Sequence, residues 1–154
     1  MAKVKAVPEG MHTVTPQIAL DDAAETLEFY KRAFGAEELS RAPDPTGKKI
    51  WHSAMRIGDS TVFVNDVFPD MGGAPQHAHL WLYLENVDAA FKRAVDAGAT
   101  VRMPVSDMFW GDRMGALSDK WGNQWTISQR VKNLTPEQAK KAGEEFAAEM
   151  AKQK

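Results

Sequence analysis

The sequence contains no cysteine, which excludes disulfide bonds, thiolate nucleophiles and zinc sites built on thiolates. It also lacks an excess of positive charge, since 19 lysines and arginines stand against 21 aspartates and glutamates, for a formal net charge of −2. This balance favours neither nucleic acid nor an anionic membrane as a partner. No apolar run approaches the length of a bilayer span, and residues 1–6 lack the apolar core of a secretory signal. We therefore expect a cytoplasmic protein.

The 154 residues do suffice for one ordinary folded domain, with 44% hydrophobic and 26% charged side chains. An internal repeat is the strongest signal within them. The stretch 15–23 runs into a helical segment that ends near Gly35, and a similar arrangement begins at 79–87, about 64 residues later. Each half reads as one strand, one helix and about three strands. Because so small a half cannot bury both faces of its sheet, the two should pack together with any ligand site between them.

Periodicity places the elements within each half. Asp22, with Glu25 three positions later, predicts an N-cap and capping box for the first helix, and Asn86 is the expected cap of the second. Residues 79–84 alternate leucines with larger amphipathic side chains, which is the pattern of a strand. The leucines should lie beneath the second helix. The opposite face then carries His79, Trp81 and Tyr83 and, by the repeat, Gln17.

Residues 135–154 predict a separate C-terminal helix. Thr135 suits the N-cap, Pro136 the first helical position and Gln138 the third, which together make a strong helix start. Apolar residues that include Phe146 and Met150 form one narrow stripe. This helix should therefore dock on the body of the protein or on a second subunit.

The duplicated unit and four short segments together resemble the vicinal oxygen chelate superfamily, which includes glyoxalase I, bleomycin-resistance proteins and extradiol dioxygenases. The segments are Phe29–Ala36, Gly58–Ser60, Phe109–Arg113 and Asp119–Trp125. The resemblance covers roughly residues 13–131 and is nearest to the demethylubiquinone-methyltransferase-like branch.

The resemblance implies an α+β fold of two tandem βαβββ modules that form an open, cupped mixed β-sheet. The modules would span about 13–70 and 77–131 within a single domain of residues 1–134, with the helix at 135–154 following. It also implies a homodimer. Function does not follow from such a scaffold, because one fold hosts many chemistries.

Enzymes of this superfamily typically hold a divalent ion with four side chains, one from the first and one from the last strand of each module. By the repeat, these positions are His79, Thr15, Thr126 and a residue near Val62 to Val64. Threonine and valine are poor ligands beside imidazole and carboxylate, so we expect no metal here and no other cofactor. A divalent metal ion remains the alternative. An untypical site would draw on His12, His52 and His77.

The predicted ligand-binding residues belong to the concave face of the cup or its rim. Aromatic side chains there can line a cavity, and the segment 109–113 adds two aromatics beside an acid and an arginine. That Asp-Arg pair could equally pin a loop. Arg113 would complement a carboxylate or similar anion. The full set is Gln17, His79, Trp81, Tyr83, Trp110 and Arg113, and no catalytic group stands out.

These observations leave the chain's status as an enzyme undecided. The first function is a metal-independent protein of the bleomycin-resistance type that binds or sequesters a small aromatic or anionic molecule. The alternative is a metal-dependent lyase, isomerase or dioxygenase acting on a small organic substrate, in which the metal stabilises an enolate or a chelated oxygen pair. A third possibility, an interaction module without a ligand, would need the cup to be filled by its own side chains.

Overall fold

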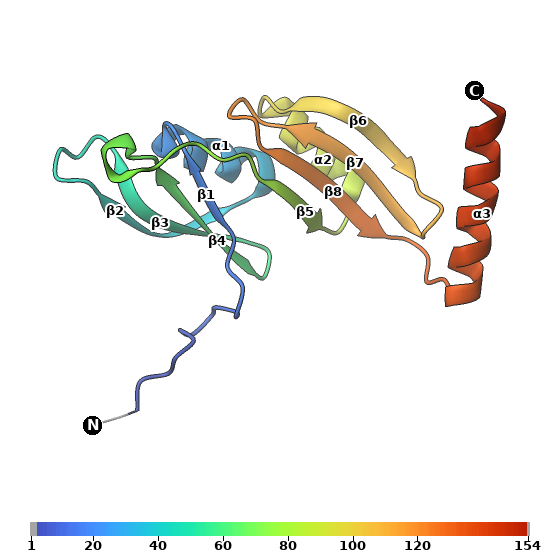
Figure 1. The fold of residues 1–154 in the computed structure, drawn as a ribbon, viewed down its shortest axis with the longest axis horizontal. Helices are drawn as coiled ribbons and strands as arrows, with labels where there is room; N and C mark the ends of the chain where they lie inside the picture. Colours follow the sequence, from blue (N-terminus) through green and yellow to red (C-terminus); the bar gives the residue numbers. More distant parts are fainter. Residues whose placement is uncertain (1–2, 154) are drawn as a thin grey trace. The chain divides into compact units, whose positions relative to one another are not determined.

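The computed structural model describes residues 3–153 and divides into two compact units, unit one (Met1–Ala78) and unit two (His79–Lys154). Each unit contains one four-stranded mixed sheet with a helix packed against it (Figure 1). The predicted α+β class and the two tandem βαβββ modules with a C-terminal helix are confirmed. None of the helices within residues 3–153 combines the length and the apolar character needed to span a lipid bilayer.

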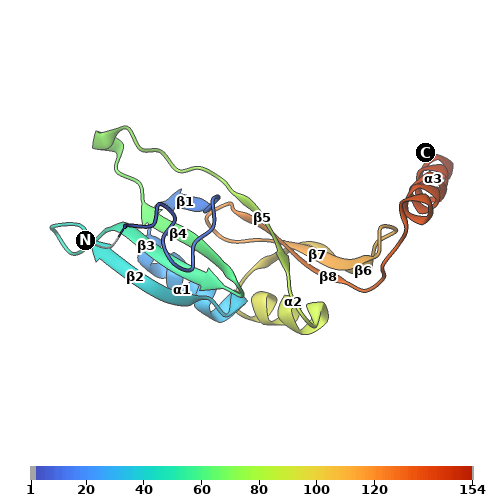
Figure 2. The ribbon, with the colours of Figure 1, turned by 90° about the horizontal axis from the view of Figure 1, so that it is seen from below.

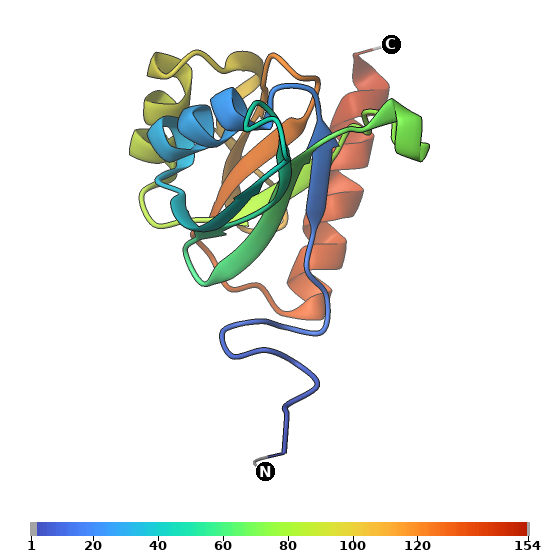
Figure 3. The same ribbon diagram turned by 90° about the vertical axis from the view of Figure 1, so that its left-hand side faces the viewer.

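Unit one contains sheet one, whose strand order is β1-β4-β3-β2. Its elements are β1 (Gln17–Leu20), α1 (Ala23–Phe34), β2 (Glu37–Pro43), β3 (Ile50–Ile57), β4 (Ser60–Asp66) and the short 3-10 helix η1 (Pro69–Met71). Strand β1 pairs in parallel with β4, and the other pairs are antiparallel. Helix α1 lies on one face of this sheet (Figure 3).

The amphipathic sequence of α1 determines which face of sheet one is the core. Leu27, Tyr30 and Phe34 are buried on the helix, and the paired Ile18 and Val64 are buried on the strands. Because side chains alternate along a strand, the neighbouring positions point away from α1. The face opposite α1, called the far face of sheet one, carries Gln17, Ala19, Phe63 and Asn65.

The start of α1 differs from the prediction. Asp22 is the N-cap residue, but it has a φ of 66° and its side chain makes no capping hydrogen bond, so the expected capping box with Glu25 is wrong. Buried Asp66, at the end of β4, takes over this role. Its Oδ1 accepts from the backbone N of Ala23 at 3.1 Å, and its Oδ2 accepts from the backbone N of Ile50 at 2.6 Å.

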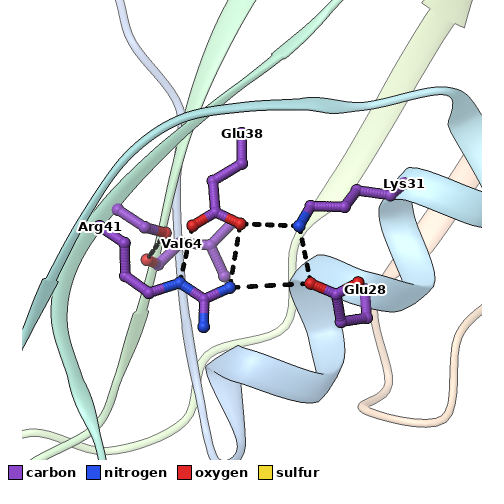
Figure 4. Close-up of polar contacts among 6 residues, drawn as sticks. Glu28, Lys31, Glu38, Arg41 and Val64 are labelled. Carbon is purple, nitrogen blue, oxygen red and sulfur yellow. Dashed lines mark hydrogen bonds and ion pairs between the residues drawn. The ribbon is translucent and has the colours of Figure 1, made fainter. Parts of the chain in front are cut away.

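Four charged side chains tie α1 to β2 on the surface of unit one (Figure 4). Lys31 Nζ lies 2.6 Å from Glu28 and 2.8 Å from Glu38, and Arg41 Nε donates to Glu38 at 2.7 Å. Arg41 hydrogen bonding, opposed by burial and aided by Lys31, lowers the pKa of Glu38 to about 2. These ion pairs therefore link α1 to β2, the edge strand of sheet one.

Unit two repeats the arrangement with sheet two, in the order β5-β8-β7-β6. Its elements are β5 (His79–Tyr83), α2 (Val87–Asp96), β6 (Thr100–Asp107), β7 (Asp112–Ser118), β8 (Gln124–Arg130) and α3 (Pro136–Lys152). Figure 2 shows α2 on one face of this sheet. The buried residues Leu117, Trp125 and Ile127 form its core.

The start of α2 agrees with the prediction, because Asn86 is the N-cap and its side chain accepts from the backbone N of Ala89. A second acceptor comes from the end of β8, where Gln129 Oε1 receives the backbone N–H of Val87 at 3.1 Å. Asn86 has a φ of 53°, like Asp22 in unit one. Both helices therefore begin after a residue in the left-handed region, and a side chain of the last strand caps each first turn.

The C-terminal helix α3 begins as predicted, with the reciprocal capping box of Thr135 and Gln138. None of its described residues is buried, and Phe146 and Met150 remain about half exposed. Its aromatic contact with the rest of unit two is Phe109, whose ring centroid lies 4.9 Å from that of Phe146. Helix α3 thus contacts the rest of unit two at Phe109, while docking on a second subunit stays a prediction.

Candidate functional site

The face of sheet two opposite α2, called the far face of sheet two, carries three of the six predicted ligand-binding residues. His79, Trp81 and Tyr83 are exposed and alternate along β5 with half-buried leucines. The rings of Trp81 and Tyr83 lie 6.4 Å apart between centroids. The predicted alternation of this strand is confirmed, while ligand binding by its residues stays a prediction.

Tyr83 reaches across β8 to a buried carboxylate, Asp112, at the start of β7. Its Oδ2 accepts from Tyr83 Oη at 2.8 Å and from Trp110 Nε1 at 3.0 Å. Its Oδ1 accepts from Arg130 Nε at 2.6 Å. The Asp112 side chain is fully buried, whereas that of Arg130 is half exposed. We call these four residues the Asp112 network.

The protonation state of Asp112 follows from these contacts. Burial alone would raise the pKa of the carboxyl, because it disfavours the charged form. The hydrogen bonds from Tyr83, Trp110 and Arg130 outweigh burial and hold the pKa of Asp112 below its usual value. Hydrogen bonding to Tyr83 and to Asp112 raises the pKa of Arg130. An ionised carboxylate whose two oxygens both accept from protein donors is suited to hold Tyr83 and Trp110 in place rather than to abstract a proton.

Two hydroxyl groups of β8 share this face. Thr126 Oγ1 lies 3.0 Å from His79 Nε2. Ser128, the register partner of Tyr83, is buried, and its Oγ has no hydrogen-bond partner within residues 3–153. An unpaired buried polar group commonly costs about 1–3 kcal/mol, so Ser128 marks a position that can accept a further polar partner.

The turn that presents Trp110 depends on a glycine. Gly111 has a φ of 97°, and a Cβ built there would lie 2.4 Å from the backbone O of Lys132. Its own carbonyl accepts from the backbone N of Val131 and of Lys132. The segment after β8 therefore packs against this turn so closely that no side chain fits.

Arg113 does not join the far face. It follows Asp112 in β7, so its side chain points to the α2 side, where it pairs with Asp88 at 2.8 Å and with Asp107 at 3.1 Å. Hydrogen bonding to Asp88 and Asp107 raises its pKa further above its ordinary value. The expected grouping of Arg113 with Trp81 and Tyr83 is therefore corrected, because adjacent strand residues face opposite ways.

Arg130 was missed in the sequence, although a signal was present. Asp112 and Arg130 are register partners in the β7–β8 hairpin, whose turn begins at Asp119. Counting outward from that turn pairs the two residues. Asp112 and Arg113 therefore do not pair with each other: Asp112 pairs with Arg130, and Arg113 pairs with its two aspartates.

Gln17 lies in unit one, beside a hollow of about 420 Å³ at the end of β1 and β4. Its Nε2 donates to Asn65 Oδ1 at 2.6 Å. The segment after β4 also lines the hollow. The backbone N–H of Gln76 attaches this segment to β1, because it donates to the Ala19 carbonyl at 3.2 Å. Gln17 is thus the one predicted residue that lines a described cavity of its own unit.

Comparison with known proteins assigns the scaffold. Residues 11–127 match the model of the glyoxalase/bleomycin resistance protein/dioxygenase superfamily. The chain belongs to this superfamily. An uncharacterized protein of Mycobacterium bovis is 40% identical over 140 residues, which covers 84% of this chain and 90% of that protein. An uncharacterized protein of Mycobacterium tuberculosis is also 40% identical, with 81% of its length covered.

Solved structures of other proteins share the fold. TioX from Micromonospora sp. ML1 has a TM-score of 0.67 at 24% identity, covering 78% of this chain and 99% of that chain. A putative 3-demethylubiquinone-9 3-methyltransferase, the PhnB protein of Bacillus cereus, has a TM-score of 0.55 at 16% identity, covering 77% and 99%. Identities this low support the fold alone.

The residues at the superfamily's typical ligand positions do not fit a divalent metal. His79 Nε2 lies within hydrogen-bond distance of a threonine hydroxyl, which is a weak ligand. In unit one the corresponding first-strand residue is Thr15, and the last-strand residue on the far face is Phe63, because Val62 and Val64 are buried on the α1 side. The predicted position near Val62 to Val64 is therefore narrowed to Phe63.

The remaining histidines are the candidates for an untypical site. His52 packs edge-to-face on Phe63, with centroids 4.5 Å apart, and His12 and His77 are exposed. Within either unit of residues 3–153, no group of three or more histidine, aspartate or glutamate side chains is arranged to hold a metal ion. The absence of a metal stays a prediction.

Proposed function

We propose that this member of the glyoxalase/bleomycin-resistance superfamily binds or sequesters a small organic molecule without a metal ion, using the far face of sheet two. One observation carries the proposal: Trp81 and Tyr83 are 45% and 58% exposed, yet the phenol of Tyr83 is fixed by the buried Asp112. A large aromatic surface held in one orientation binds flat molecules at a low entropic cost.

Two further groups support the same face. Ser128 offers a buried hydroxyl without a partner in the described residues, and Arg130 keeps half of its side chain exposed while paired to Asp112. An aromatic molecule with a polar or anionic substituent could stack on Trp81 and reach the guanidinium. Arg130 would then take the role that the sequence suggested for Arg113.

A tryptophan substitution tests the proposal. We expect 1-naphthoate to show saturation-transfer NMR signals with the wild-type protein and to lose them in Trp81→Ala. Trp51→Ala is the matched control, because Trp51 is similarly exposed at 52% but lies in unit one. Equal binding of 1-naphthoate to all three proteins would refute the assignment of the far face. A wild-type protein that neither binds 1-naphthoate nor carries a co-purified small molecule in native mass spectrometry would refute it as well.

Metal independence has its own test. The midpoint of thermal unfolding should be unchanged by EDTA, since a ligand bound only to the folded state would raise it. Elemental analysis of protein purified without chelator should give no stoichiometric transition metal. A tightly bound ion coordinated by His79 would instead support the metal-dependent lyase, isomerase or dioxygenase.

We also propose that the protein is a homodimer. The exposed stripe of Phe146 and Met150 on α3, a helix without a buried residue in its described part, supports an interface there. Light scattering should give twice the chain mass of 17.1 kDa, and truncation after Leu134 should shift the protein toward monomer. A monomeric full-length chain at micromolar concentration would end this proposal.

A further inference from the structure

The hollow of unit one is lined by apolar side chains and by carboxamides. Its volume of about 420 Å³ lies within the range of roughly 300–1,000 Å³ typical of small-molecule sites. The apolar residues are Ala19, Val67, Phe68, Met71 and Ala74. The carboxamides are Gln17, Asn65 and Gln76.

The hollow offers no exposed formal charge. Asp66 is the single charged residue of its lining, and it is only 4% exposed. Both of its carboxylate oxygens already accept backbone N–H groups, from Ala23 and Ile50. An ionic ligand would therefore lose hydration without forming a direct ion pair with an exposed side chain, which is costly in a partly enclosed site.

The carboxamides offer donors and acceptors together. Gln17 uses one Nε2 hydrogen on Asn65, and Asn65 uses one Nδ2 hydrogen on the carbonyl of Asp66. Since each amide has two N–H donors and two acceptor lone pairs, both side chains keep a donor and an acceptor for another molecule. Their mutual bond of 2.6 Å also holds the two amides in one orientation.

The segment between β4 and Gln76 is shaped by its own turn. Gly72 and Gly73 donate backbone N–H groups to Pro69 and Phe68, and a Cβ at Gly73 would lie 3.1 Å from the backbone of Phe68. This tight turn presents Phe68 and Met71 on the hollow. A flat ring can pack against such apolar side chains while its edge faces the amides.

We propose that this hollow binds an uncharged, planar molecule with neighbouring N–H and C=O groups, the chemistry shared by lactams, aromatic primary amides and nucleobase-like rings. The inference goes beyond the proposed function, because the hollow is a second site, in unit one, and it assigns a class of ligand to that site and a role to Gln17. Complementary amide pairs of this kind discriminate against analogues that carry only donors or only acceptors.

The test uses four probes of similar size. We expect 2-pyridone and benzamide to shift the side-chain NH₂ resonances of Gln17, Asn65 and Gln76 saturably in ¹⁵N-labelled protein. Benzoate and benzylammonium should not shift them. Saturable binding of either charged probe at these resonances, equal to or tighter than that of 2-pyridone, would overturn the inferred class.

Two variants of Gln17 and one control variant sharpen the result. Gln17→Ala should weaken 2-pyridone binding by about three- to tenfold, the value of one hydrogen bond. Gln124→Ala is the matched control, because Gln124 is also an exposed glutamine at the first position of a strand, but in sheet two. Gln17→Glu should reverse the preference, weakening 2-pyridone and admitting benzylammonium.

The outcomes separate this inference from the proposed function. Failure of all four probes to shift the three amides overturns the ligand class, while the behaviour of Trp81→Ala decides the proposed function independently. An unchanged affinity of Gln17→Ala for 2-pyridone, with resonances showing an intact fold, would likewise overturn the role of the carboxamides.

Discussion

In unit one the last strand holds its helix through a buried carboxylate, whereas in unit two a half-buried carboxamide occupies the same place. Asp66 accepts from the first residue of α1 and also from Ile50, while Gln129 accepts only from the first residue of α2. The helix starts are 64 positions apart, but the capping side chains are 63 apart. The repeat therefore preserves the geometry of the cap, while residue identity and spacing have changed.

The two β-hairpin turns of the units give the largest expected difference. Gly47, between β2 and β3, has a φ of 71° and open space around its Cβ position, whereas Gly111, between β6 and β7, faces a backbone oxygen at 2.4 Å. Gly111→Ala should lower the free energy of unfolding by about 3 kcal/mol or more, and Gly47→Ala by about 1 kcal/mol. Urea unfolding of both variants measures the two changes in the free energy of unfolding. Equal changes would show that the segment after β8 can move away from Gly111 at little cost.

The two caps give the next largest difference. Asp66→Ala should lower the free energy of unfolding by about 2–3 kcal/mol, because it leaves two buried backbone N–H groups without an acceptor. Gln129→Ala should cost about 1 kcal/mol, since Asn86 still caps α2. Chemical denaturation of the two variants compares them directly. A larger loss for Gln129→Ala would mean that unit two depends on its cap more than unit one does.

Much of this architecture was predictable because it depends on local patterns. The period of two in β5, the Asn86 cap and the capping box of α3 are all set by neighbours within a few residues. The cap of α1 was not predictable from the sequence, because its acceptor Asp66 lies 43 positions beyond Ala23. Sequence patterns do not report such pairs unless the strand register is known.

The same dependence on strand register explains the differences between the predicted and the observed candidate site. The repeat gave a position near Val62 to Val64 without deciding the face of the sheet, and the strand register places Phe63 on the far face, because the repeats differ by one residue there. A shift of one residue moves a side chain to the other face of a sheet. Arg113 was misplaced for a related reason, since the motif 109–113 spans a turn and a strand whose side chains alternate.

The far faces of the two sheets differ more than their cores. Sheet one presents two amides and a phenylalanine, and sheet two presents an imidazole, an indole and a phenol. Core positions on both sheets remain aliphatic or aromatic. Duplicated modules thus keep the packing that folds them, while the exposed faces diverge in chemistry, which is where binding specificity arises.

Each unit also ties its helix to its sheet with charges, and this gives the smallest expected effect. In unit one, Lys31 and Arg41 pair with the largely buried side chain of Glu38, which is 20% exposed. In unit two, Arg113 pairs with Asp88 and Asp107, whose side chains are 60% and 70% exposed. Exposed pairs are screened by solvent, so the unit-one network should respond more strongly to pH.

Glu38 provides the test of that difference. Arg41 hydrogen bonding, opposed by burial and aided by Lys31, lowers its folded-state pKa from 4.5 to about 2. A lowered pKa contributes stability that is present above the unfolded value and is lost as the pH falls toward the folded value. Between about pH 5 and pH 2.5, the free energy of unfolding should therefore fall by about 1 kcal/mol less in Glu38→Gln than in the wild type.

Asp88→Asn is the matched control in unit two, where Arg113 lowers the pKa of an exposed carboxyl. The pH dependence of its free energy of unfolding should stay closer to that of the wild type. Urea unfolding at both pH values measures the comparison, and a larger change for Asp88→Asn would assign the stronger helix-to-sheet linkage to unit two.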